Sequence, residues 1–115
     1  MAVTGDLPEA VRSIEKAVAL DPDATATDLY VVAAQIYRAS GRYDDAIAVA
    51  REAIAKHRGA AQDTVQVRIE LARALAAAGQ IAQAITELDA VLAITPNDPV
   101  ALQLRNQLRS KISAP

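Results

Sequence analysis

The sequence predicts an all-α fold in which antiparallel helix hairpins stack side by side, with about six helices in total. Glycine recurs at positions 5, 41 and 79, spaced by 36 and then by 38 residues. The same spacing of apolar residues follows each glycine: Leu7, Ala10, Ile14 and Ala17, then Tyr43, Ala46, Ala50 and Ala53, then Ile81, Ala84, Leu88 and Val91. No segment alternates for long with the period of a strand, and residues that favour helices are abundant. Internal repeats of this length indicate stacked helical hairpins.

Glycine and proline mark where the predicted helices end. Gly41 and Gly79 each follow an apolar helical stretch, where a left-handed residue closes a helix and lets the chain reverse. Gly5 is expected to mark the same kind of corner, in a half repeat whose first helix would precede the chain. Pro22 and Pro96 are expected to end the second helix of a hairpin, because proline cannot continue the helical hydrogen bonds.

These marks and the apolar spacing predict helices over residues 7–20, 25–40, 43–57, 62–78, 81–94 and 99–112. The first carries an apolar stripe, and the second and fourth begin in loops whose Asp, Thr and Gly content favours turns and helix caps. The third opens with Asp44 and Asp45, whose charges are stabilised by the free backbone N–H groups of a first turn. The fifth follows its corner glycine directly. Asp98 caps the sixth, and Pro99 fits its first turn.

The apolar pattern also continues upstream of two glycines, with Tyr30, Ala33, Ala34 and Tyr37 before Gly41, and Arg68, Leu71, Ala72 and Leu75 before Gly79. The whole pattern resembles the tetratricopeptide repeat, a unit of about 34 residues made of two antiparallel helices. The resemblance covers nearly the whole chain and implies a right-handed α-α superhelix. It divides a single domain, residues 1–115, into a half repeat (1–24), two repeats (25–60 and 61–98) and a capping helix (99–115), and it implies a piece of a longer protein.

The resemblance further implies a binding surface, because the first helices of successive repeats line a concave groove that family members commonly use to hold a peptide or a partner's helix. The pattern places in this groove Asp28, Val31, Gln35, Arg38, Gln66, Ile69, Arg73 and Ala76, with Gln103 and Gln107 at its far end. Arg38 and Arg73 flank two apolar residues there, so we expect a protein or peptide partner with an apolar anchor and an acidic group. The alternative is that these are merely solvated polar positions.

One known use of such a groove does not fit this sequence. Family members that clamp the acidic C-terminal tails of chaperones use a set of Lys, Asn and Arg residues in it. Val31 and Gln35 stand where the Lys and the Asn are expected, which argues against that activity.

The sequence offers little for catalysis, and we expect no enzyme, metal or cofactor. Cysteine is absent, which excludes disulfides and thiol nucleophiles. His57 is the only histidine and lies in the last turn of a predicted helix, where its charged form would complement the dipole. A net charge of -2 and the lack of a basic stripe argue against nucleic acid. No long apolar stretch or signal peptide occurs, so we expect no membrane partner and, by default, a cytoplasmic location.

A second hypothesis is that the chain is a structural or self-associating segment of a larger protein. The predicted helix over residues 7–20 lacks a preceding helix to pair with, and Val11 is expected on its open flank. An exposed apolar flank favours weak homo-oligomers through this helix. The last helix is expected to stay solvated, because Arg105, Asn106 and Arg109 occupy places where a further repeat would need core residues.

Overall fold

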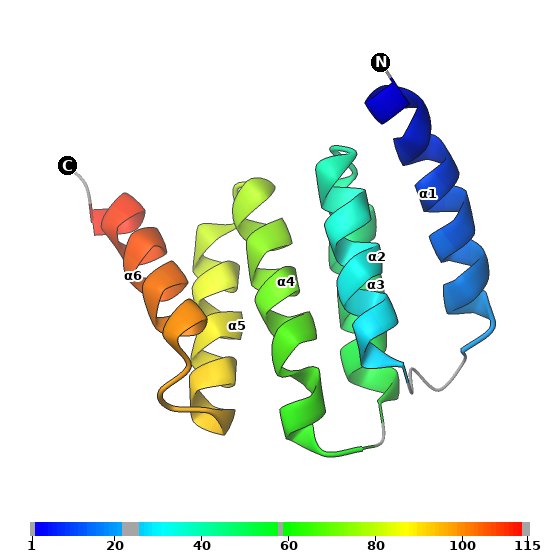
Figure 1. The fold of residues 1–115 in the computed structure, drawn as a ribbon. Coiled ribbons are helices and arrows are strands. Elements are labelled where there is room, and N and C mark those ends of the chain that lie inside the picture. The colour runs from blue at the N-terminus through cyan, green and yellow to red at the C-terminus, as the bar shows by residue number, and fades with distance from the viewer. Residues whose placement is uncertain (1, 22–25, 58, 114–115) are drawn as a thin grey trace.

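The computed structural model describes residues 2–21, 26–57 and 59–113, and these residues form a row of antiparallel helices (Figure 1). The helices are α1 (Ala2–Ala19), α2 (Thr27–Ala39), α3 (Tyr43–Lys56), α4 (Val65–Ala77), α5 (Ile81–Ile94) and α6 (Pro99–Ser113), with a short 3-10 helix, η1 (Ala61–Thr64), before α4. No strand occurs among these residues. The predicted all-α stack of helix hairpins is therefore confirmed.

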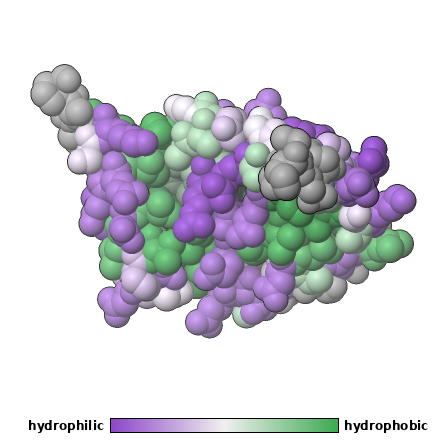
Figure 2. Space-filling view, turned by 45° about the horizontal axis from the view of Figure 1, so that its top comes forward, coloured by the Kyte–Doolittle hydropathy of each residue, from purple (hydrophilic) through white to green (hydrophobic). Residues whose placement is uncertain are grey.

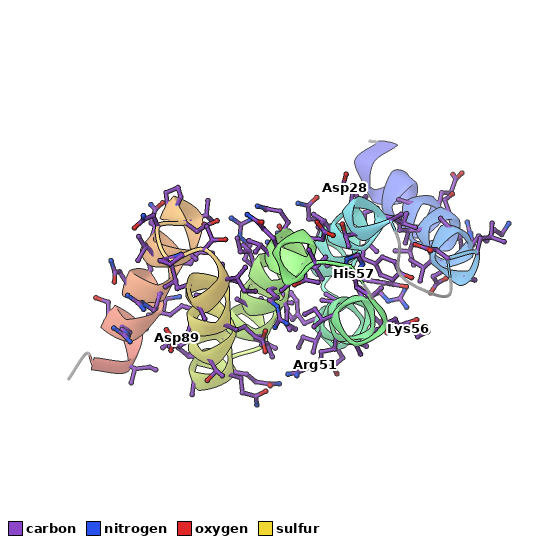
Figure 3. All side chains as sticks on the ribbon, turned by 90° about the horizontal axis from the view of Figure 1, so that it is seen from below. Asp28, Arg51, Lys56, His57 and Asp89 are labelled. Carbon is purple, nitrogen blue, oxygen red and sulfur yellow. The ribbon has the colours of Figure 1, made fainter. Side chains whose placement is uncertain are left out.

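The helices form two layers, with α2, α4 and α6 in one layer and α3 and α5 in the other (Figure 3). Each helix packs on its neighbour in sequence, and α4 also packs directly on α2 and on α6. The stack measures 41 × 37 × 19 Å, so it is broad and only about two helices thick. Side chains of α2, α4 and α6 that point away from the other layer therefore share one face of the molecule.

The corners at Gly41 and Gly79 have the same geometry, as the repeated sequence predicts. Their φ angles are +75° and +86°, in the left-handed region. The N–H of Arg42 donates to the carbonyl of Tyr37 at 2.8 Å, and the N–H of Gln80 donates to the carbonyl of Leu75 at 2.8 Å. These bonds satisfy carbonyl groups that a helix end would leave open. Each glycine thus reverses the chain and places α3 or α5 beside the helix before it.

Small residues fill the contacts between the two layers. Ala46, Ala50 and Ala53 of α3 are at most 1% exposed, and Ala84 of α5 is fully buried. Larger residues complete the core, among them Tyr30, whose hydroxyl donates to the backbone carbonyl of Asp21 at 2.8 Å. The small residues let the helix axes approach closely.

Several helix boundaries differ from the predicted ones. Gly5 is not a corner, because α1 runs without a break from Ala2 and also includes Pro8. A reversal at Gly5 would need a helix in front of it, and the described residues before Gly5 are part of α1 itself. The segment 62–64 is a 3-10 turn rather than α-helix, with the hydroxyl of Thr64 bonded back to the carbonyl of Ala61 at 2.6 Å. The predicted helix start at Thr25 and the predicted stop at Pro22 lie outside the described residues.

The apolar stripe of α1 faces α2, which corrects the expected position of Val11. Val11 is 5% exposed and Ile14 is 8% exposed, so neither lies on an open flank. The residues between them, Arg12 and Ser13, are exposed. One stripe at helical spacing has only one direction to face, and α2 already covers it. Val11 therefore gives no support to self-association through α1.

Candidate partner-binding surface

A buried carboxylate, Glu70, joins α2 to α4 on the shared face of α2, α4 and α6. Glu70 is 4% exposed, yet it is surrounded by donors. Its Oε1 lies 3.3 Å from Nη2 of Arg38, and its Oε2 lies 3.2 Å from Nη1 of Arg73 and 3.2 Å from Nε2 of Gln35. A buried charge is tolerated when it is paired and hydrogen-bonded, as this one is.

Beside this network lies a cleft of about 290 Å³ between α2, α4 and α6. Four residues predicted for the groove line it, Arg38, Arg73, Ala76 and Gln107. The other lining residues are Ala72, Leu88, Leu104, Leu108 and Lys111. Among these described residues the charged ones are all basic. The cleft thus combines an apolar floor with a rim that carries positive charge.

The remaining predicted groove residues lie outside this cleft. Asp28, Gln35, Gln66 and Gln103 are exposed, and Val31 is half-buried. Ile69 differs from the expectation, because it is 1% exposed and belongs to the core. Ile69 holds in α4 the register that Val31 holds in α2. Because α2 packs directly on α4, this register is buried in α4, whereas it is only half-buried in α2. Ile69 is therefore unable to serve as an exposed apolar anchor.

The two arginines are also less free than the sequence suggests. Their side chains are 34% and 35% exposed, and each bonds to Glu70. One carboxylate faces two guanidinium groups, so the pairing leaves an excess of positive charge at the cleft. Lys111, at the far side of the cleft, is exposed and adds to this excess.

Glu70, Leu104, Leu108 and Lys111 were not predicted as site residues. A signal for Glu70 was present in the sequence, since it stands in the register that Val32 occupies one hairpin earlier and has Arg73 three residues after it. Leu104 and Leu108 of α6 stand four positions apart, a spacing that is typical of a face packed on another helix. Their exposure to a cleft depends on the spacing between α4 and α6, which the sequence does not give.

A second hollow, of about 340 Å³, lies between α1, α2 and α3 and is lined partly by Glu15, Tyr37 and Asp45. Its carboxylates are already engaged. The hydroxyl of Tyr37 donates to Oε2 of Glu15 at 3.2 Å, and Nε of Arg42 donates to Oδ2 of Asp45 at 2.8 Å. Burial, followed by the bond to Glu15, raises the pKa of Tyr37, and the bond to Asp45 raises the pKa of Arg42. We therefore assign this hollow to the packing of α1 rather than to a ligand.

His57 has a structural environment at the joint between the two hairpins. Its Nε2 lies 3.2 Å from Oδ2 of Asp63, and its side chain is 9% exposed. Gly59 lies against the ring, where an added Cβ would come within 2.6 Å of Nε2. The described residues contain no group of three or more His, Cys, Asp or Glu side chains placed to hold a metal.

Comparisons with known proteins identify the repeat. Residues 31–99 match the family model described as tetratricopeptide repeat, which is more than half of the chain. The search of curated proteins finds no match to this sequence. In the described part of the chain, every helix is too short or too polar to cross a membrane. The matched segment contains α3, α4, α5 and residues 31–39 of α2, which carry the Glu70 network and five of the nine residues that line the cleft.

Proposed function

Because the chain belongs to the tetratricopeptide repeat family, we propose that it binds a segment of a partner protein in the cleft between α2, α4 and α6. The family is a non-enzymatic scaffold whose repeats generally mediate protein–protein interaction. The observation that carries the proposal is the convergence of Arg38, Arg73 and Gln107, from three different helices, around one leucine-lined cleft.

The lining favours a partner that is acidic and carries an apolar anchor. Leu104 is half-buried and Leu108 is 6% exposed, so an apolar side chain placed in the cleft would cover apolar surface that is still partly wet. Arg38, Arg73 and Lys111 surround that position, and a carboxylate next to the anchor would form charge-assisted hydrogen bonds with them. Anchors of this kind supply most of the energy of a small interface, whereas the charges give selectivity and a fast association rate.

Amide side chains extend the proposed site along the same face. Gln66 and Gln103 are exposed on α4 and α6, and Gln107 lines the cleft itself. Each can both donate and accept, as the backbone of an extended peptide requires. Asp28 and Val31, on α2, would contact the part of the ligand farthest from the cleft.

A selection from an unbiased library of displayed peptides tests this proposal. Peptides that bind the wild-type chain but not Lys111→Glu should be enriched in Asp or Glu next to Leu, Ile or Phe. Lys16→Glu makes the same change of charge at an exposed position of α1 and serves as the matched control. The affinity of the enriched peptides for the wild-type chain should fall as salt is added, because exposed charges are screened. Enrichment of basic peptides, or equal binding by Lys111→Glu and Lys16→Glu, would refute the assignment.

A further inference from the structure

The face formed by α1 and α2 at the start of the stack carries apolar residues that no described element covers. Val32 is 44% exposed, and Leu29 and Ile36, on the same side of α2, are half-buried. Figure 2 shows apolar surface in two areas, one on each side of a central polar band. Three apolar residues at positions i, i+3 and i+7 form one stripe along a helix, which is the usual mark of a face that packs on something.

The repeat itself shows what such a stripe packs on. The residues of α4 in the registers of Leu29, Val32 and Ile36 are Val67, Glu70 and Ala74, and they are exposed by 0%, 4% and 0%. The helix beside α4 is α2, whose Gln35 and Arg38 bond to Glu70. The three registers are thus buried in α4, which has α2 beside it, and only partly covered in α2, where Val32 is exposed and the other two residues are half-buried.

The residues of α1 agree with this comparison. Ala10 and Ala17 are half-buried, whereas Ala46 and Ala53, which hold their registers in α3, are exposed by 0% and 1%. α3 packs on both α2 and α4, whereas α1 packs mainly on α2. A helix bound at this face would therefore contact the alanines of α1 on one side and the apolar stripe of α2 on the other.

We propose that the α1–α2 face binds one amphipathic helix of a partner protein, laid beside α2 as α2 lies beside α4. The register comparison also gives the chemistry of that helix. Where α4 has the carboxylate of Glu70, which takes hydrogen bonds from Gln35 and Arg38, α2 has the apolar side chain of Val32. The partner helix must then present apolar side chains at the places that Gln35 and Arg38 hold in α2, because polar ones would be buried without partners.

A second copy of the chain is a poorer occupant. The other end of the same layer is α6, whose exposed residues include Gln103, Asn106 and Arg109. Although α6 also exposes Val100 and Ile112, most of its exposed residues are polar, so copies stacked end to end would bring a largely polar helix against Val32. The proposal is independent of the cleft between α2, α4 and α6, because none of its residues lines that cleft.

Two peptides based on α2 test the proposal by fluorescence anisotropy. The first has the sequence of residues 26–40, and the second has the same sequence with Gln35→Leu and Arg38→Leu. The full wild-type chain should bind the leucine-bearing peptide at least about tenfold more tightly than the first. The variant Val32→Glu should reverse this order, since its carboxylate would pair with the Gln and Arg of the first peptide in the way that Glu70 pairs within the chain.

Control variants separate the possible outcomes. Val100→Glu alters another exposed valine, on α6, and should leave both affinities unchanged, as should Lys111→Glu in the cleft. Equal binding of the two peptides by the wild type, no binding of either, or no effect of Val32→Glu would overturn the proposal. A concentration-dependent dimer that Val32→Glu abolishes and the leucine-bearing peptide does not displace would instead identify a second copy as the occupant, which also overturns it.

Discussion

Arg38 and Glu70 lie 32 positions apart and join two successive hairpins through a contact of 3.3 Å between Nη2 and Oε1. The carboxylate is almost fully buried, whereas the guanidinium is about one-third exposed. The same carboxylate takes a bond from Arg73. A single anion thus fixes two cations at the edge of the cleft, which restricts their side chains before any partner arrives and lowers the entropy that binding would cost.

The first prediction concerns this anion. Glu70→Gln should lower the free energy of unfolding by about 1 to 3 kcal/mol, because it leaves Arg38 and Arg73 near each other without their counter-charge. Urea denaturation measures the change. Glu9→Gln removes the same charge from an exposed position of α1 and should have almost no effect. Equal midpoints for the two variants would show that the buried contacts contribute nothing to stability.

This network also changes what a charge reversal at the cleft would report. From the sequence, Arg38→Glu with Arg73→Glu is expected to weaken binding and leave melting nearly unchanged, because both side chains are assumed to be exposed. The structure places both against Glu70, so the double variant would crowd like charges around a buried carboxylate and destabilise the fold. Lys111 is the better position for a test of binding, since it is exposed at the far side of the cleft.

The second prediction concerns the alanines between the layers. Ala46→Leu or Ala84→Leu should overpack a helix contact and cost about 1 to 3 kcal/mol, because both residues are fully buried. Ala48→Leu and Ala82→Leu are matched controls on exposed positions of α3 and α5. A urea midpoint that falls no further for the buried pair than for the exposed pair would contradict the register of the two helices.

The third prediction separates packing from self-association at α1. Val11→Glu should destabilise the stack, since it places a carboxylate at a position that is 5% exposed, whereas Leu20→Glu should not, since Leu20 is 84% exposed. The expected loss for Val11→Glu is about 2 to 5 kcal/mol, or local detachment of α1. Thermal melting and sedimentation of both variants measure this. A stable Val11→Glu variant with an altered oligomeric state would instead show that Val11 lies on an open surface.

The sequence predicted the fold well because its strongest signals are local. A glycine with a left-handed φ closes a helix wherever it stands after an apolar stretch, and both Gly41 and Gly79 do so. The boundaries of α5, Ile81 and Ile94, agree with the predicted ones because Gly79 precedes its start and Pro96 follows its end. Gly5 has the same spacing but lies within α1, because a corner also depends on what precedes it.

The site was harder to predict because it depends on distances between helices. Register alone placed Ile69 and Val31 on the same face, but the contact between α2 and α4 buries the first and not the second. The burial of Glu70 and the opening of Leu104 to the cleft likewise depend on the separation of helices that are far apart in sequence. A pattern of apolar residues specifies which helix face is turned inward, but not how closely the next helix approaches it.

The fourth prediction concerns alkaline pH. Burial, followed by the nearby charge of Asp21, raises the pKa of Tyr30 above the ordinary phenol value of 10.0, and burial with the bond to Glu15 does the same for the pKa of Tyr37. A raised pKa means that the folded state holds the phenol proton more tightly than the unfolded state. The stabilisation is therefore complete below about pH 10 and is lost as the pH rises through the folded-state values.

The urea midpoint of the wild type should therefore fall as the pH rises above about 10. Tyr30→Phe should be less stable than the wild type at neutral pH, because it loses the bond of 2.8 Å to the carbonyl of Asp21, but its stability should fall less at high pH. Tyr43→Phe, at a position that is 37% exposed, is the matched control and should follow the wild type throughout. A parallel decline of all three proteins would mean that the buried phenols do not govern alkaline unfolding, and the loss would then come from deprotonated lysines or from the general charge of the chain.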